Sequence, residues 1–144
     1  LVLAYRKDID LFFNEMVYQT GLTNRDIHNR LLSLGFDRRT EIFADSAEPK
    51  SIKELQLFGW NIKPTAKGKD SVMAGIDMLK RYKLNVTKSS VNLIKELRNY
   101  KFVEDYNGKD LNKPVDEYNH AIDAMRYATY NRLSRPNYGR YAVR

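Results

Sequence analysis

Two short segments of this sequence place acidic side chains in surroundings where carboxylates can do chemistry. The first is residues 44–49, with the sequence ADSAEP, which follows a short apolar run. A strand ending at Asp45 would deliver that side chain to the carboxyl end of a sheet, where α/β proteins bind their ligands. A simpler role competes, because Asp, Ser or Glu next to a helix-opening proline commonly caps the helix. Taken alone, the segment favours capping, and Glu48 in particular is expected to be a helix-start residue rather than a ligand.

The second segment is residues 119–128, with the sequence NHAIDAMRYA. On a helix, His120 and Asp123 are three positions apart and share a face, and Tyr127 follows one turn later. A different stripe of the same helix, suited to the core, holds Ile122, Met125 and Thr129. An acid and an imidazole therefore project together, although the spacing alone favours an ordinary solvated face.

The composition limits which kinds of chemistry these residues can support. The chain has 144 residues, no cysteine and two histidines, His28 and His120. Disulfides, thiolate zinc sites and cysteine nucleophiles are excluded, so a metal site must depend on carboxylates, which suit Mg²⁺ or Mn²⁺. The formal net charge of +7 favours a polyanionic partner such as nucleic acid. No run approaches the ~20 apolar residues of a membrane span, and the absence of cysteine suits a reducing cytoplasm.

The elements that must position these side chains alternate between strands and helices. Apolar runs and turn residues predict strands over 1–6, 10–18, 41–44, 60–62 and 85–87, and a hairpin from residue 100 onward. Periodic apolar stripes predict helices over 23–35, 49–59, 70–82, 89–97 and 116–133. At the first of these helices, Thr23 and Asp26 form a capping-box pattern. This order predicts one α/β domain over residues 1–133, with a mixed sheet and helices on its faces, and a mobile tail over 134–144.

Taken together, the two acidic segments resemble the nuclease half of tailed-phage terminase large subunits. The residues between the segments agree with this resemblance. Residues 18–24, YQTGLTN, resemble the turn from the third strand into the first helix of that family. Residues 67–76, KGKDSVMAGI, resemble its "K-G-x-x-S-V-x-x-G-I" helix start. The resemblance covers the chain from Leu1 to Leu133.

The resemblance implies a ribonuclease-H-like fold that cuts concatemeric double-stranded phage DNA during genome packaging. In such families carboxylates hold two divalent cations, Mg²⁺ or Mn²⁺, and Asp45 and Asp123 match two of the acids. His120, beside the helix acid, is expected to orient a water, assist proton transfer or join the metal ligands. Expected partners are double-stranded DNA and, in the full protein, the terminase small subunit and the portal, in the cytoplasm of a bacterial host and without a membrane or small-molecule cofactor.

The sequence departs from this family pattern in two places. The family's first acid lies in a strand that would precede Leu1, and Asp8 and Asp10 sit in a hairpin turn, where neither can replace it. We therefore expect the first strand to be missing from this chain, and the fragment to bind divalent metal weakly and to cut DNA poorly or not at all. Neither Gly68 nor Gly108 begins a Gly-Lys-Ser/Thr phosphate loop, so the packaging ATPase lies outside this chain.

Lys63, Lys67 and Lys69 form a basic group before a predicted helix start. Flexible amines near exposed amides suit DNA phosphates, although a merely solvated loop fits equally well. Two other functions also remain open. One is a non-catalytic DNA-binding or assembly module, and the other is a ribonuclease-H-like nuclease of the resolvase or transposase type. The residues before Leu1 would distinguish them, since an ATPase followed by an acid-bearing strand indicates a terminase.

Overall fold

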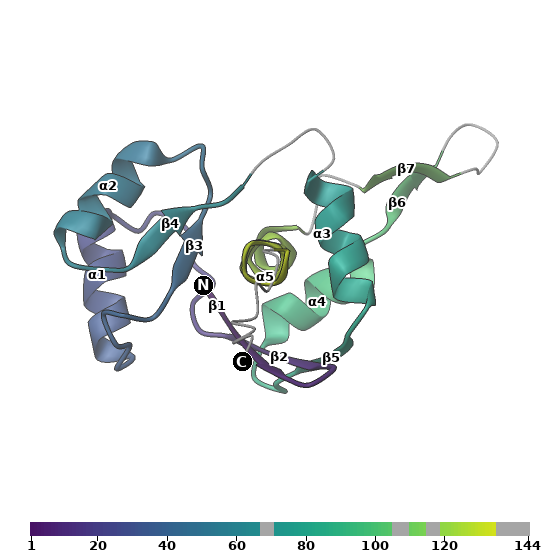
Figure 1. Cartoon of the computed structure of the whole chain (residues 1–144), viewed down its shortest axis with the longest axis horizontal. Coiled ribbons are helices and arrows are strands. Elements are labelled where there is room, and N and C mark those ends of the chain that lie inside the picture. The colour runs from purple at the N-terminus through teal and green to yellow at the C-terminus, as the bar shows by residue number, and fades with distance from the viewer. Residues whose placement is uncertain (67–70, 105–109, 115–118, 135–144) are drawn as a thin grey trace, which may run out of the picture.

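The strands form three separate sheets in the computed structural model of the chain, which describes residues 1–66, 71–104, 110–114 and 119–134 (Figure 1). In the largest sheet, β1 (Val2–Lys7) pairs antiparallel with β2 (Asp10–Glu15), which pairs parallel with β5 (Lys83–Val86). The second sheet holds the parallel pair β3 (Ile42–Ala44) and β4 (Ile62–Pro64). The third is the predicted hairpin, β6 (Phe102–Glu104) and β7 (Asp110–Pro114).

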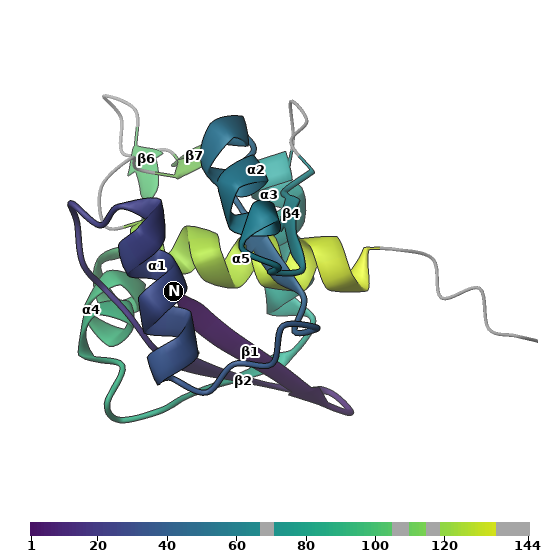
Figure 2. The ribbon, with the colours of Figure 1, turned by 90° about the vertical axis from the view of Figure 1, so that its left-hand side faces the viewer.

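In the described part of the chain, five helices pack on these strands, and one of them is central. They are α1 (Asn24–Ser33), α2 (Pro49–Leu57), α3 (Ser71–Lys80), α4 (Val91–Asn99) and α5 (His120–Leu133). Helix α5 contacts α3, α4, β1 and β3, and Figure 2 shows it lengthwise over β1 and β2. Helices α1 and α2 lie on the other side of β3 and β4 from α5 (Figure 1). The predicted mixed sheet with helices on its faces is confirmed.

The main core lies between α5 and the largest sheet. Alternation along β2 buries Leu11 and Phe13 and leaves Phe12 exposed on the opposite face. The buried residues that join them come from α3, α4 and α5 and are Leu79, Leu93, Ala121, Ile122 and Met125. The core stripe predicted for the last helix is therefore confirmed, since Thr129 is buried as well. This packing fixes the rotation of α5 and so determines which side chains point away from the core.

A second core holds α1 and α2 against β3 and β4. Its buried members are Leu31, Ile52, Leu55, Trp60 and Ile62. The predicted strand over 60–62 was wrong by two residues, because Trp60 precedes β4 and packs into this core. The Trp60 indole donates a hydrogen bond to His28 Nδ1 over 3.1 Å. At the start of α1, the predicted capping box between Thr23 and Asp26 is confirmed.

Several predicted boundaries shift for physical reasons. Strand β2 ends at Glu15 rather than Tyr18, because regular pairing with β1 stops at Val2 and Glu15, and the amides of Met16 and Val17 both donate to the Leu1 carbonyl oxygen. Strand β5 begins two residues earlier than predicted, since Lys83 pairs with Asp10 in the parallel register. Helix α5 begins at His120, and residues 116–118 of its predicted start lie outside the described part of the chain. Residues 135–144 of the predicted tail also lie outside it. None of the described helices is long and apolar enough to cross a bilayer.

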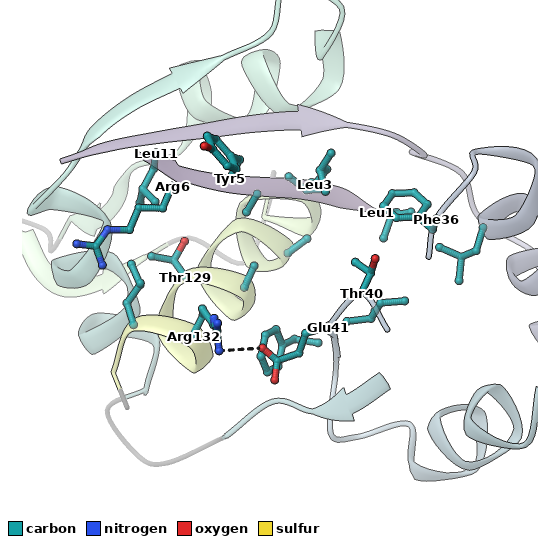
Figure 3. Close-up of a pocket in the computed structure, with 18 residues that line it drawn as sticks. Leu1, Leu3, Tyr5, Arg6, Leu11, Phe36, Thr40, Glu41, Thr129 and Arg132 are labelled. Carbon is teal, nitrogen blue, oxygen red and sulfur yellow. Dashed lines mark ion pairs between the residues drawn. The ribbon is translucent and has the colours of Figure 1, made fainter. Parts of the chain in front are cut away.

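A groove of about 390 Å³ lies between the sheet of β1, β2 and β5 and the sheet of β3 and β4 (Figure 3). The edge strand β1 lines one wall along residues 1–6, and residues 40–43, at the start of β3, line the other. Small side chains of α5, Ala124, Ala128 and Thr129, form part of its lining. Within the described residues, β1 pairs only with β2 and β3 only with β4. That the fold includes a further strand stays a prediction.

Candidate active site

Asp45 directly follows the last residue of β3, and each of its two carboxylate oxygens accepts a hydrogen bond. Its Oδ1 accepts a hydrogen bond from the Ala47 amide over 2.8 Å, and its backbone oxygen accepts one from the Glu48 amide over 3.1 Å. These bonds form the turn that leads into α2, which begins at Pro49 as predicted. Oδ2 accepts a longer hydrogen bond, 3.3 Å, from the hydroxyl of Tyr127 on α5. Asp45 therefore shapes the turn with one oxygen and faces α5 with the other, and the exposed Glu48 side chain makes no capping bond.

Asp123 lies in the first turn of α5 and is bonded on one side only. Its Oδ1 accepts two hydrogen bonds from Arg126, from Nε over 3.2 Å and from Nη2 over 2.8 Å. The Arg126 side chain is 5% exposed, whereas that of Asp123 is 29% exposed. Among the described residues, none donates a hydrogen bond to Asp123 Oδ2. As far as the described residues go, one carboxylate oxygen of this partly exposed acid can therefore accept a ligand.

Two neighbouring residues of α5 connect Asp123 to Asp45. The Arg126 guanidinium lies over the Tyr127 ring, 4.7 Å from its centre, while the Tyr127 hydroxyl contacts Asp45. Helix α3 supports this pair at close range. A Cβ on Gly75 would lie 2.3 Å from Arg126 Cγ, so only glycine admits the arginine stem here. The fold therefore brings the two predicted acids to the same stretch of α5, on either side of an Arg-Tyr pair.

The start of α5 is fixed by Glu96, a buried acid on α4. Glu96 Oε2 accepts hydrogen bonds from the amides of Ala121 and Ile122, over 2.7 and 3.0 Å. Its Oε1 accepts one from the Tyr18 hydroxyl over 2.9 Å, and this hydrogen bond raises the pKa of Tyr18. The N-cap residue Asn119 makes no side-chain capping bond, so Glu96 takes that role across the core. This contact sets where Asp123 lies.

His120 does not join the two acids into a recognisable metal centre. It is the exposed first residue of α5. Across the described parts of the chain, no group of three or more His, Asp or Glu side chains is close enough to hold a metal ion. Carboxylate oxygens are the donors that Mg²⁺ and Mn²⁺ prefer, so Asp45 and Asp123 fit a divalent cation in kind. Two carboxylates are, however, fewer ligands than a pair of divalent cations requires.

Of the three lysines predicted to bind DNA, one lies in a described strand and two lie outside the described residues. Lys63 lies in β4, not in a loop as predicted, because β4 extends to Pro64. Its ammonium pairs with Glu41 at 2.5 Å, and Glu41 also pairs with Arg132 of α5 at 3.5 Å (Figure 3). Lys67 and Lys69 lie outside the described residues. Lys63 can therefore bind a DNA phosphate only if its ammonium leaves Glu41 or contacts Glu41 and the phosphate together.

Sequence reasoning missed the contacts of three residues that organise this region. Arg126 is the counter-ion of Asp123, and the i,i+3 spacing of the two residues is a local signal that could have found it. Tyr127 was placed on the face of Asp123, but its contact with Asp45 spans 82 positions. Glu96 reads as an ordinary helix glutamate, and nothing local in the sequence marks it as the cap of another helix.

Comparisons with known proteins agree on one family. The family model described as "Terminase RNAseH like domain" matches residues 3–130. The chain is 39% identical over 92 residues to the terminase large subunit of Bacillus phage SPP1. That match covers 60% of this chain and 22% of the relative, so the chain spans about a fifth of its length.

Two solved structures resemble this fold. One is the large-terminase nuclease domain of bacteriophage SPP1 with bound Mn, with a TM-score of 0.81 and 25% identity. The likeness covers 91% of this chain and 76% of that one. The other is the large terminase of a thermophilic bacteriophage, with a TM-score of 0.68 and 16% identity over 90% of this chain and 35% of that one. The second likeness concerns the fold alone, and both agree with a ribonuclease-H-like architecture.

Proposed function

The chain belongs to the terminase ribonuclease-H-like domain family, and from this premise we propose that it is a metal-dependent endonuclease domain that cuts concatemeric double-stranded DNA during phage genome packaging. One observation carries the proposal. Asp45 and Asp123, 78 positions apart in the chain (123 − 45), converge on one stretch of α5 through Tyr127 and Arg126. Carboxylates converging from a strand end and a helix are what divalent-metal hydrolysis of a phosphodiester needs.

The roles of the residues follow from their contacts. Asp45 and Asp123 would hold Mg²⁺ or Mn²⁺, which supplies charge stabilisation at the phosphate and lowers the pKa of an attacking water. The relative solved with Mn supports this cation class. His120 is exposed one turn before Asp123, where an imidazole can orient a water or accept its proton. We further propose that the ligand set is completed by an acid that the described residues do not supply.

The test compares metal-dependent cutting by matched single-site variants. We expect the 144-residue chain to nick supercoiled plasmid slowly with Mn²⁺ or Mg²⁺, because the described residues supply only two carboxylates to the proposed site. Asp45→Asn or Asp123→Asn should reduce the nicking rate on the order of 100-fold or more, since each removes a negative ligand. Asp77→Asn is the control, because Asp77 is an exposed aspartate on α3.

Two outcomes would contradict the proposal in different ways. Robust metal-dependent nicking that neither substitution reduces would mean that the active site lies elsewhere. DNA binding without any nicking, in this chain and in a longer polypeptide that adds a strand beside β1, would favour a non-catalytic DNA-binding or assembly module.

We also propose that Lys63, Lys67 and Lys69 contact the DNA backbone. The net charge of +7 supports a polyanionic partner, and the three lysines follow one another closely in the chain. Replacing all three by glutamine should weaken binding of duplex DNA and reduce the slope of log affinity against log salt by about 2–3, or about 0.9 for each phosphate that the protein no longer neutralises. The control removes the same charge elsewhere, at the exposed Lys7, Lys50 and Lys53. Equal slopes for both triple variants would assign the three lysines to a solvated surface.

A further inference from the structure

Arg126 is a buried charged residue that bonds to only one of the two carboxylate oxygens of Asp123. Its side chain is 5% exposed, and both of its hydrogen bonds to the acid end on the same oxygen, Oδ1. An arginine that binds a carboxylate as a fork usually engages both oxygens. Here Oδ1 receives two donors, whereas Oδ2 receives none from the described residues. Within the described part of the chain, Oδ1 is therefore occupied by the guanidinium, and Oδ2 accepts no hydrogen bond.

The arginine itself is held from three sides. Its stem crosses α3 where Gly75 has no Cβ, its guanidinium lies over the Tyr127 ring, and its Nη1 lies 3.5 Å from the Ser71 carbonyl oxygen. A side chain constrained in this way has few other rotamers available. Because the arginine side chain has few alternative positions, it can hold the Asp123 carboxylate in one orientation.

From this geometry we infer that Arg126 is a positioning residue, which holds Asp123 by Oδ1 so that Oδ2 is presented to a divalent cation. The inference rests on the proposed function, in which Asp123 is a metal ligand. The charge of Arg126 acts in the opposite direction, because a guanidinium next to a cation site repels the cation. Positioning and charge therefore predict opposite results when the arginine is removed, and an experiment can separate them.

The experiment titrates the chain with MnCl₂ and measures free Mn²⁺ by electron paramagnetic resonance. Arg126→Met keeps an unbranched stem and removes both the donors and the charge, whereas Arg126→Lys keeps the charge and removes the fork. If Arg126 positions Asp123, both variants should bind Mn²⁺ about 10-fold or more weakly, as for other residues that orient a metal ligand. If Arg126 acts only through its charge, Arg126→Met should bind Mn²⁺ more tightly and Arg126→Lys should match the unsubstituted chain. That second pattern would overturn the inference.

Controls separate this inference from the proposed function and from misfolding. Arg132→Met removes the same charge from an arginine of α5 whose side chain is 70% exposed, and it should leave Mn²⁺ affinity within about 2-fold, since exposed charges are screened. If Asp123→Asn loses Mn²⁺ affinity but neither Arg126 variant does, only the positioning role fails. If Asp123→Asn changes nothing, or the unsubstituted chain binds no Mn²⁺, the proposed site fails and the inference with it. Thermal unfolding of each variant shows whether it is folded, and Arg126→Lys decides the question if Arg126→Met is not.

Discussion

Glu96 and Asp123 are both carboxylates beside α5, but their surroundings differ. Glu96 is 2% exposed and accepts three hydrogen bonds spread over both oxygens, two from backbone amides of α5 and one from Tyr18. Asp123 is 29% exposed and accepts two hydrogen bonds, both from Arg126 and both on one oxygen. The two α5 residues whose amides bond to Glu96, Ala121 and Ile122, lie within one helix turn of Asp123.

The difference indicates which acid serves the fold and which is available for chemistry. A buried carboxylate with donors on both oxygens has little capacity left for a ligand, and its bonds stabilise the arrangement of two helices. A partly exposed carboxylate, with one oxygen that accepts no hydrogen bond from the described residues, costs less to desolvate and can still accept a cation. Glu96 therefore determines where α5 begins, and Asp123 uses the position that Glu96 provides.

The largest effect that this comparison predicts is a loss of folding stability when Glu96 is replaced. Glu96→Ala should lower the free energy of unfolding by about 3 kcal/mol or more, because two helix-end amides and the Tyr18 hydroxyl lose a charged acceptor at once. Urea unfolding followed by circular dichroism measures this loss. Glu48→Ala is the control, because Glu48 is exposed and its side chain makes no capping bond. A loss below about 1 kcal/mol at Glu96 would mean that Asn119 or water can cap α5 instead.

Local signals in the sequence were enough for much of the fold. Thr23 and Asp26 lie three positions apart, so their capping box is readable before any tertiary structure forms. Pro49 opens α2, and the buried stripe of α5 follows helical periodicity. The family motifs also pointed to Asp45 and Asp123, although their metal-binding roles stay predictions.

Contacts between distant segments could not be predicted in the same way. Glu96 contacts α5 across 25 positions, and Tyr127 contacts Asp45 across 82. Lys63 belongs to a strand because β4 pairs with β3, which a lysine-rich run does not indicate. In each case the deciding partner is brought close by packing, on which local propensity carries no information.

The smaller predicted effect is the stability change at Asp123, which tests whether that acid is mainly a structural counter-ion. Asp123→Asn leaves the Arg126 guanidinium buried beside a neutral amide, whose oxygen can still accept hydrogen bonds from the arginine but carries no compensating charge. We therefore expect a loss of about 1–2 kcal/mol in the free energy of unfolding, below that of Glu96→Ala. A double-mutant cycle with Arg126→Met isolates the pair, and a coupling energy of about 1 kcal/mol would fit a partly exposed ion pair. If Asp123→Asn instead destabilised the chain as much as Glu96→Ala, the contrast between the two acids would fail. Asp123 would then be a second structural carboxylate, and its free oxygen would no longer argue for a cation site.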